Sequence, residues 1–410
     1  MLKNIIIIND SASIKGGAEK VAIQSAFGLS ECGYNVILFT AIGPIDPELK
    51  NHNIKVICLN QYDILNDPNR LRAIRQGLWN KKAKKIFKQT LTEFSPHDTI
   101  IHFHSWTKAL SPSLFNVTRK LSFPIVITSH EYFTVCPNGG FFDYKHKKIC
   151  TISPLSYNCL KCNCDVRSYP QKIWRFIRQL IFKRTFLENK IFMIFISDLT
   201  ERVILSHIGK YIVKHYRLTN PIELNQHKPV NITQNDTYIF IGRLSEEKGA
   251  ELFCKVITEL GLKGCILGQG YLFEELKNKY STIKFAGWVT GKDKEELIRK
   301  GKALVFPSLW YEGAPLTIME MKSYGIPCIV PDKCAASEEI TDGKTGLIFK
   351  SGNYNSLKAA IEKYEKSNIQ EYQNNIISSF SAEKYSLSNH LNGLLEIYNN
   401  ILSLNKQNHI

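Results

Sequence analysis

Short apolar runs alternate with helix-length segments along nearly the whole chain. The first series of runs is Asn4–Asn9, Asn35–Thr40, Lys55–Leu59, Thr99–His104, Pro124–Ser129 and Ile191–Ser197. A second series is Tyr238–Ile241, Cys265–Leu267, Ile283–Phe285, Ala303–Phe306, Cys328–Val330 and Gly346–Phe349. Buried parallel strands have this continuous apolar character, and helices connect them. The alternation therefore predicts an α/β chain with parallel sheets that are covered by helices on both faces.

The polar, turn-rich stretch 220–236 separates the two series and predicts a linker. With 410 residues the chain is long enough for two complete cores, so we expect two doubly wound, Rossmann-like domains that face a cleft. The first is predicted to comprise residues 1–220, with a cysteine-rich insertion at 131–169, and a C-terminal helix at 384–410 that returns to it. The second comprises residues 221–383. Ligands bind beyond the carboxyl ends of such strands, so the site should follow strands directly.

The formal charge of +16 indicates an anionic partner. Composition does not choose between nucleic acid, a phosphate-bearing substrate and acidic lipid headgroups. Because the chain has no recognisable nucleic-acid-binding module, we expect no nucleic-acid partner. No apolar run approaches the length that spans a bilayer. The first ten residues predict a strand in place of a signal peptide, which indicates a cytoplasmic protein.

A basic segment at 172–190 has an amphipathic helical pattern. One arc of that helix carries Ile173, Trp174, Ile177, Leu180 and Ile181, with Lys172, Arg175 and Lys183 largely opposite. Such a helix could lie on an anionic membrane surface. A helix that packs on the core and exposes a solvated basic face fits the same pattern equally well.

The stretch 310–329 combines a loop, a helix start and two carboxylates. A helical pattern opens at Pro315, directly after a buried apolar run. Unpaired N–H groups and the positive end of the helix dipole favour a phosphate at the amides of Leu316 and Thr317. Glu312 precedes this turn and Glu320 follows about two turns later, and each carboxylate can accept hydrogen bonds from a diol. The combination predicts a nucleotide sugar as ligand.

A second group of charges, Arg243 and Lys248, follows the first strand of the second half, in the segment 242–249. Two cations at a strand end can neutralise a diphosphate, and their attraction grows as a departing diphosphate gains charge. For such a turn in isolation, a solvated charged loop is the alternative interpretation.

These two motifs resemble those of the retaining nucleotide-sugar glycosyltransferases with the GT-B fold, glycosyltransferase family four or group 1. The family's marks are a Gly-Arg-Leu…Lys-Gly turn, here at 242–249, and two glutamates separated by seven residues, here Glu312 and Glu320. The family's Gly-Gly loop also recurs, as Gly16 and Gly17. The resemblance covers nearly the whole chain and is weakest at 60–95 and 132–170. It implies sugar transfer from a nucleotide-diphosphate donor with retention of the anomeric configuration.

The resemblance also implies a role for each matching residue. The parts expected to hold the donor diphosphate are Arg243, Lys248, the amides of Leu316 and Thr317, and Gly16 and Gly17 from the opposite domain. Glu320 would accept the ribose hydroxyls, Glu312 would contact the transferred sugar, and the backbone near Val289 would receive the base. The sequence has no pair of aspartates separated by one residue, which fits a reaction that needs no metal or other catalytic cofactor.

His130 ends a predicted strand of the first half and should face the cleft. It matches the family's active-site histidine, so we expect a catalytic role, although a lone histidine is more often structural. His102 and His104 end the neighbouring strand and share a face. A place in the acceptor pocket and a plain packing role are equally compatible with that pattern.

The eleven cysteines fall into two groups. Those in apolar contexts, expected to be buried, are Cys32, Cys58, Cys254, Cys265, Cys328 and Cys334. The other five crowd into the insertion, where Cys159 and Cys162 have the spacing of a zinc knuckle that Cys136 and Cys150 would complete. A structural zinc site and free thiols are the two alternatives, and the loop is expected to shape the acceptor site.

Together these features predict a glycosyltransferase of bacterial surface polysaccharide synthesis, such as that of lipopolysaccharide or capsule. Its acceptor would be a glycan or a polyprenyl-diphosphate-linked sugar, and it would bind peripherally to the cytoplasmic face of the inner membrane. The alternative is a catalytically inactive nucleotide-sugar-binding scaffold subunit. The combined presence of Arg243, Lys248, Glu312 and Glu320 argues against that alternative, because an inactive copy has no physical need for all four.

Overall fold

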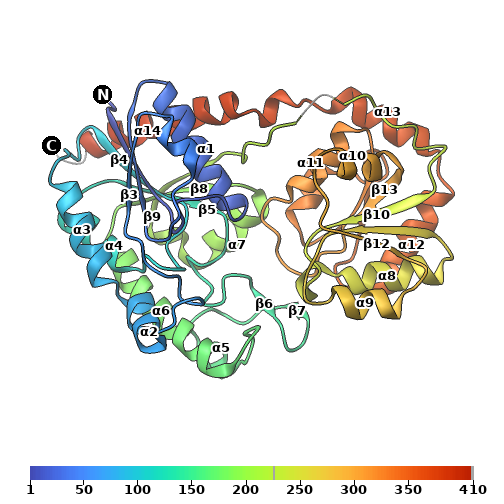
Figure 1. The fold of residues 1–410 in the computed structure, drawn as a ribbon, viewed down its shortest axis with the longest axis horizontal. Coiled ribbons are helices and arrows are strands. Elements are labelled where there is room, and N and C mark those ends of the chain that lie inside the picture. Colours follow the sequence, from blue (N-terminus) through green and yellow to red (C-terminus); the bar gives the residue numbers. More distant parts are fainter. Residues whose placement is uncertain (225–226, 408–410) are drawn as a thin grey trace.

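The computed structural model describes residues 1–224 and 227–407. Within these ranges the chain forms two lobes, each built on a parallel sheet (Figure 1). No helix of the described part is long and apolar enough to cross a membrane. Residues 225–226 of the predicted linker and 408–410 of the predicted C-terminal helix lie outside the described residues.

The first lobe contains, among the described residues, seven parallel strands in the order β3-β2-β1-β4-β5-β8-β9. Their bounds are β1 Asn4–Ile8, β2 Asn35–Thr40, β3 Ile54–Cys58, β4 Thr99–Phe103, β5 Ile125–Ser129, β8 Ile191–Phe195 and β9 Ile212–Arg217. Six of these strands match predicted runs. The seventh, β9, was not predicted because it lies at the sheet edge and is polar and largely exposed.

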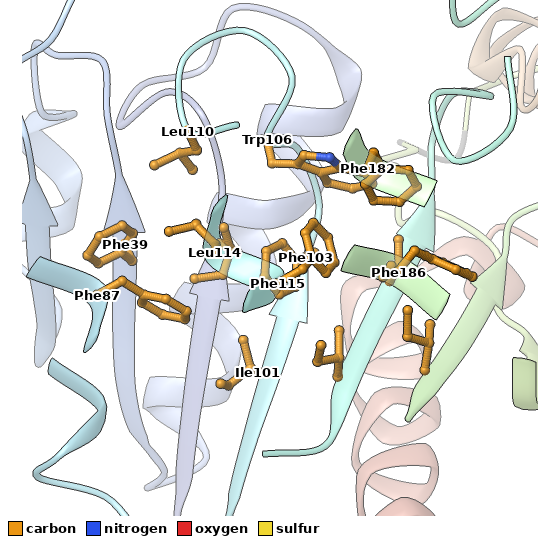
Figure 2. Close-up of a cluster of buried hydrophobic side chains, with 14 of the residues drawn as sticks. Phe39, Phe87, Ile101, Phe103, Trp106, Leu110, Leu114, Phe115, Phe182 and Phe186 are labelled. Carbon is orange, nitrogen blue, oxygen red and sulfur yellow. The ribbon is translucent and has the colours of Figure 1, made fainter. Parts of the chain in front are cut away.

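Helices cover both faces of this sheet. They are α1 Gly17–Glu31, α2 Arg70–Leu78, α3 Lys81–Leu91, α4 Ser113–Lys120, α5 Tyr157–Lys161, α6 Tyr169–Leu187, α7 Asp198–Ile208 and α14 Leu387–Gln407. On one face an aromatic core joins the sheet to α3, α4 and α6, with Phe103 and Phe115 stacked at its centre (Figure 2). On the other face α1 and α14 pack side by side, and Gly28 leaves room for Leu391. The last helix of the chain therefore packs on the first sheet.

The second lobe has, in its described part, six parallel strands in the order β12-β11-β10-β13-β14-β15. The strands are β10 Thr237–Ile241, β11 Lys263–Leu267, β12 Lys284–Gly287, β13 Gly301–Val305, β14 Cys328–Pro331 and β15 Gly346–Phe349. Its helices are α8 Ala250–Glu259, α9 Phe273–Lys279, α10 Gly291–Arg299, α11 Leu316–Ser323, α12 Tyr354–Glu365 and α13 Ile369–Ser379. Both sheets have the doubly wound order that was predicted.

The cysteine-rich insertion lies at the bottom of the view in Figure 1, with its hairpin toward the second lobe. It forms a short hairpin of β6 Phe142–Asp143 and β7 Lys148–Ile149, followed by α5. Lys147 at the hairpin tip forms a 2.9 Å ion pair with Glu246 of the second lobe. Gly140 lies against the ring of Trp310, since a Cβ there would be 3.1 Å from that ring. The insertion therefore reaches the loops that follow β10 and β13.

Helix α6 does not bury the whole apolar arc that the core-packing alternative predicted. Phe176, Phe182 and Phe186 face the core, whereas Ile177 and Leu180 are exposed. Lys172, expected on the polar face, is buried, and its Nζ lies 3.3 Å from Cys159 Sγ. The helix is apolar on more than one side, so periodicity alone did not identify the stripe that the core takes.

Two buried histidines tie α14 and the segment after β9 to the first sheet. His102 lies 2.6 Å from the Tyr398 hydroxyl and 2.7 Å from the Thr128 hydroxyl. His390 lies 2.8 Å from the carbonyl of Thr219. Burial lowers the pKa of His390 to about 4 and lowers the pKa of His102 well below its ordinary value. Both rings are therefore neutral at pH 7.

Acid should weaken this attachment. Between about pH 6.5, the ordinary pKa of histidine, and about 4, the unfolded chain binds a proton at His390 that the folded chain does not. The free energy of unfolding should therefore fall as the pH is lowered through that window. His390→Gln removes this titration, so urea unfolding at a series of pH values should give a shallower decline than in the parent protein. An identical slope in both proteins would contradict the assignment.

Candidate active site

The central loops of the second lobe meet where its strand order reverses. Strand β10 is followed by the 242–249 turn, and its neighbour β13 is followed by the loop that leads into α11. In doubly wound sheets the connections diverge at this point and leave a crevice. Gly249 lets the two loops touch: it has φ +70°, and a Cβ there would lie 2.0 Å from the carbonyl oxygen of Pro307. Arg243, Lys248 and Glu312 thereby come to one edge of the sheet.

Lys248 and Glu312 form a half-buried ion pair in this crevice. The Lys248 ammonium lies 2.5 Å from Glu312 Oε1 and 5.2 Å from the centre of the Trp310 ring. The Ser308 hydroxyl and the Trp310 indole N–H also donate to the Glu312 carboxylate, at 3.1 and 3.0 Å. Burial raises the pKa of Glu312, but the charge of Lys248 and these hydrogen bonds outweigh it and lower the pKa below its ordinary value. The Glu312 carboxylate is therefore held in its charged form.

Arg243 lies beside this pair with much of its side chain in solvent. It bonds to Glu247 at 2.8 Å, and its side chain is 63% exposed whereas that of Glu247 is 3% exposed. The buried carboxylate fixes one edge of the guanidinium. The remaining N–H donors of Arg243 face a cavity and are available to an anion.

Helix α11 begins at Leu316, and its first turn has no side-chain cap. Pro315 is the residue before the helix, with an extended ψ of 94°, and not the first helical residue that the pattern predicted. Leu316 lines the cavity, and Thr317 is the next residue of the helix. The N–H groups of Leu316 and Thr317 have no hydrogen-bond partner among the described residues, whereas the Ile318 N–H donates to the carbonyl of Pro315 at 3.1 Å.

A cavity of about 730 Å³ extends from this helix start across to the first lobe. Arg243, Val289, Leu316 and Glu320 line it from the second lobe, and Lys20 of α1 lines it from the first. Glu320 is paired with Lys294 of α10 at 2.5 Å, so the second predicted carboxylate lies in the same cavity as Arg243. The volume falls within the range typical of small-molecule sites.

The first lobe contributes a smaller cavity of about 190 Å³, which Gly16, Gly17, His104 and His130 line. Gly17 does not line the larger cavity, although Lys20, one turn further along α1, does. Gly313 brings the lobes together here, since a Cβ at Gly313 would lie 3.7 Å from the carbonyl oxygen of His130. The loop that carries Glu312 therefore meets the predicted active-site histidine.

The rings of His104 and His130 are hydrogen-bonded, with His104 Nδ1 2.9 Å from His130 Nε2. Burial lowers the pKa of His130 to about 4 and that of His104 well below its ordinary value, so both rings are neutral at pH 7. His104 Nε2 is buried without a hydrogen-bond partner in the described structure. A bare acceptor costs less there than an unpaired N–H, so we assign the His104 proton to Nδ1, as donor to His130. His130 then carries its own proton on Nδ1.

His102 and His104 have different surroundings despite sharing a face. His102 is packed between Tyr398 and Thr128, as the packing alternative predicted. His104 lines the smaller cavity, as the pocket alternative predicted. The sequence pattern could not separate the two residues, because their difference comes from α14, which covers only one of them.

The structure does not bring the cysteines into a metal site. Within residues 1–224 and 227–407, no group of three or more His, Cys, Asp or Glu residues is arranged to hold a metal ion. The zinc ligands expected at Cys136, Cys150, Cys159 and Cys162 are therefore not supported. Part of the reason is that Cys136 pairs with Asn138, while Cys159 meets the Lys172 ammonium. Among the cysteines expected to be buried, Cys32 is exposed and Cys58 is half-buried.

Sequence reasoning missed the three lysines of the large cavity, Lys20, Lys292 and Lys294. Lys294 lies on α10, which begins just after β12 and its following turn, so the strand-end rule applied to β12 could have indicated it. Lys20 follows the Gly-Gly loop in the sequence, so the motif that identified Gly16 and Gly17 could also have indicated Lys20. All three add positive charge around the predicted anion site.

Comparison with known proteins finds glycosyltransferases among the proteins that this chain resembles. Residues 222–380 match the family model of glycosyl transferases group 1. An uncharacterised protein of the cps region of Klebsiella pneumoniae is 22% identical over 259 residues, which cover 59% of this chain and 69% of that protein. The Escherichia coli UDP-Gal:α-D-GlcNAc-diphosphoundecaprenol α-1,3-galactosyltransferase is 26% identical over 172 residues, covering 37% of this chain and 44% of that enzyme.

The likeness to solved structures extends over the whole chain. HepE of Anabaena, solved in complex with UDP, superposes with a TM-score of 0.66 at 14% identity. The match covers 97% of this chain and all of that one, and at this identity it establishes the fold alone. The chain therefore has the GT-B fold, and its second lobe, which carries Arg243, Lys248, Glu312 and Glu320, matches the family model of the group 1 glycosyl transferases.

Proposed function

We propose that this glycosyltransferase moves a sugar from a nucleotide-diphosphate donor to a glycan or polyprenyl-diphosphate-linked acceptor, with retention of anomeric configuration. The observation that carries the proposal is the Lys248–Glu312 ion pair, which lies at the strand-order reversal of the second lobe. We assign donor binding to residues 221–383. Acceptor binding is assigned to residues 1–220 together with the C-terminal segment 384–410, which contains α14.

In this proposal the donor diphosphate lies between Arg243, Lys248 and the first turn of α11. These groups carry positive charge before the reaction begins, so they stabilise the leaving diphosphate without rearranging. Glu320 accepts the ribose hydroxyls and Glu312 contacts the sugar. Because two cations and a helix dipole neutralise the leaving group, the chemistry needs no divalent metal.

The acceptor approaches from the first lobe, where His130 lines the smaller cavity. Its hydroxyl attacks on the face that the diphosphate leaves, which gives retention. His130 is neutral and has a free Nδ1–H under the assignment above, so it can donate a hydrogen bond to the sugar or acceptor. The Escherichia coli relative is named for a diphosphoundecaprenol acceptor, which supports a lipid-linked acceptor here.

A membrane surface is the proposed second partner. Helices α2, α3 and α6 lie together on one side of the first lobe and contain basic residues but no acidic ones (Figure 1). Leu71 and Ile74 of α2, with Ile177 and Leu180 of α6, are exposed among these charges. Exposed aliphatic side chains within a basic face are typical of peripheral binding to anionic lipid.

Replacing Lys248 or Glu320 tests the donor site. Lys248→Ala and Glu320→Ala should each lower kcat/KM by about 100-fold or more, because each removes a charged or hydrogen-bonding group from the donor. The matched control is Lys333→Ala, at an exposed lysine of the same lobe. Transfer assayed with a panel of nucleotide sugars gives the measurement. Near-parent turnover in either variant would overturn the assignment, and a parent protein that binds nucleotide sugars without turnover would favour the scaffold alternative.

Replacing His104 tests the proposed orientation of His130. His104→Leu removes the N–H that fixes the His130 ring and should lower kcat by about tenfold, with little change in the donor KM. His104→Asn places an amide N–H near the position of Nδ1 and should recover part of the loss. If the two variants have equal kcat and equal unfolding midpoints, the hydrogen bond does not position His130.

Sedimentation with vesicles tests the membrane partner. The double variant Leu71→Ser/Leu180→Ser should bind vesicles containing anionic lipid more weakly than the parent, and binding by both should fall as salt is raised. Ile377→Ser is the control, since Ile377 is an aliphatic residue on the second lobe that is as exposed as Leu180. Equal losses in the control and the double variant would rule out this face as the membrane contact.

A further inference from the structure

A third cavity, of about 350 Å³, lies in the first lobe between α6 and the loop before α2. Six residues line both this cavity and the one that holds His130: Lys15, Glu19, Thr107, Lys108, Glu131 and Phe133. The two cavities are therefore adjacent and share a wall. We call the cavity of about 350 Å³ the α6 cavity.

Arg178 is the unusual residue of the α6 cavity. Its side chain is buried, and its guanidinium donates to the carbonyls of Thr107 and Pro137 at 3.1 and 3.4 Å. Among the described residues no carboxylate lies within ion-pair distance of it. Burial, and then the neighbouring Arg175, lower the pKa of Arg178 to about 9. Asp10, Glu131 and Asp165 act on its charge from a greater distance and raise the pKa, so the guanidinium is a buried cation without a direct ion-pair partner in the described structure.

The other charges that line the α6 cavity are mostly engaged. Lys108 pairs with Glu19 at 2.7 Å, and Arg175 pairs with Asp165 at 3.3 Å. Asp63 accepts the backbone N–H groups of Leu65 and Asn66, within its own turn. Lys15 is exposed at the rim, and Glu131 is the remaining carboxylate. Four cations (Lys15, Lys108, Arg175 and Arg178) and three carboxylates (Glu19, Asp63 and Glu131) therefore line the cavity, so its wall carries an excess of one positive charge.

The rest of the wall is apolar. Ile64, Leu65, Phe133 and Trp174 line the cavity, and the Arg178 guanidinium lies 5.3 Å from the Trp174 ring. Trp174 packs against α2 at Gly77, where a Cβ would lie 2.5 Å from the indole. The apolar wall thus continues through Leu65, itself half exposed, to the exposed side chains of α2 and α6.

We propose that the α6 cavity binds the diphosphate of a lipid-linked acceptor, with Arg178 and Lys15 as the anion contacts and the apolar wall as the start of the lipid path. The inference rests on the proposed function, which it deepens by choosing the lipid-linked acceptor over a free glycan and by assigning a site to its diphosphate. A diphosphate supplies the negative charge that Arg178 lacks. The shared wall then places the acceptor sugar beside His130, and the lipid leaves toward the exposed aliphatic side chains.

Binding of farnesyl diphosphate, measured by isothermal titration calorimetry without any nucleotide sugar, tests the inference. The parent should bind it, whereas Arg178→Gln and Lys15→Glu should each bind about tenfold more weakly because each removes a cation from the diphosphate. Lys183→Gln, at an exposed lysine of the same helix, should bind as the parent does. Lys15 is exposed, so Lys15→Glu remains informative if Arg178→Gln does not fold.

Two further ligands separate the sources of the signal. Farnesol should bind much more weakly than farnesyl diphosphate, and so should inorganic pyrophosphate. Equal affinity for pyrophosphate would overturn the lipid assignment, and equal affinity of all variants for farnesyl diphosphate would overturn the cavity. The assay needs no turnover. A protein that binds the probe but transfers no sugar would retain this site while the proposed function fails, and active transfer without probe binding would give the reverse result.

Discussion

The cleft is held by a carboxylate of one lobe at a helix start of the other. Glu338 accepts the backbone N–H groups of Asp198 and Leu199, at 2.9 and 2.6 Å, where α7 of the first lobe begins. An anion at a helix N-terminus is stabilised by unpaired N–H groups and by the dipole. Glu338 lies in a short 3-10 segment whose Ala335 N–H donates to the carbonyl of Glu312 at 3.0 Å. The contact between the lobes is therefore connected through a few residues to the proposed donor site.

That connection explains how two separate sheets can form one site. Gly313 follows Glu312 and packs on Thr200 of the first turn of α7, since a Cβ at Gly313 would lie 3.0 Å from the Thr200 methyl group. The same turn of α7 thus meets both Glu338 and the loop that carries Glu312. Lys248 and Glu312 are already paired and half buried, so part of their desolvation has taken place before a ligand arrives. Such a pair adds little stability, but it fixes the positions of both groups.

The sequence predicted those parts of the structure that local chemistry determines. Parallel strands that are buried on both faces are continuous apolar runs, so twelve strands could be derived from the sequence. Strand ends and helix starts are also marked by local patterns, so the position of Glu312 between a strand and a helix could be derived as well. Strand β9 was missed because an edge strand needs no apolar run. The Lys294–Glu320 ion pair and the His104–His130 hydrogen bond join segments that are distant in the chain. The lack of an ion-pair partner for Arg178 among the described residues likewise depends on how distant segments pack. No local pattern records such contacts.

Composition alone does not identify the anionic partner that the large positive charge of the chain indicates. The structure shows where part of that charge lies. Helices α2, α3 and α6 place basic side chains on one side of the first lobe, and the exposed residues among them include Leu71, Ile74, Ile177 and Leu180. Nucleic acid is bound through phosphate contacts, base edges and aromatic stacking, and gains little from aliphatic side chains. An anionic lipid surface offers both headgroup charge and an apolar interior to such a face. The burial of Phe176, Phe182 and Phe186 against the core leaves the second apolar stripe of α6 exposed, as the proposed membrane contact requires.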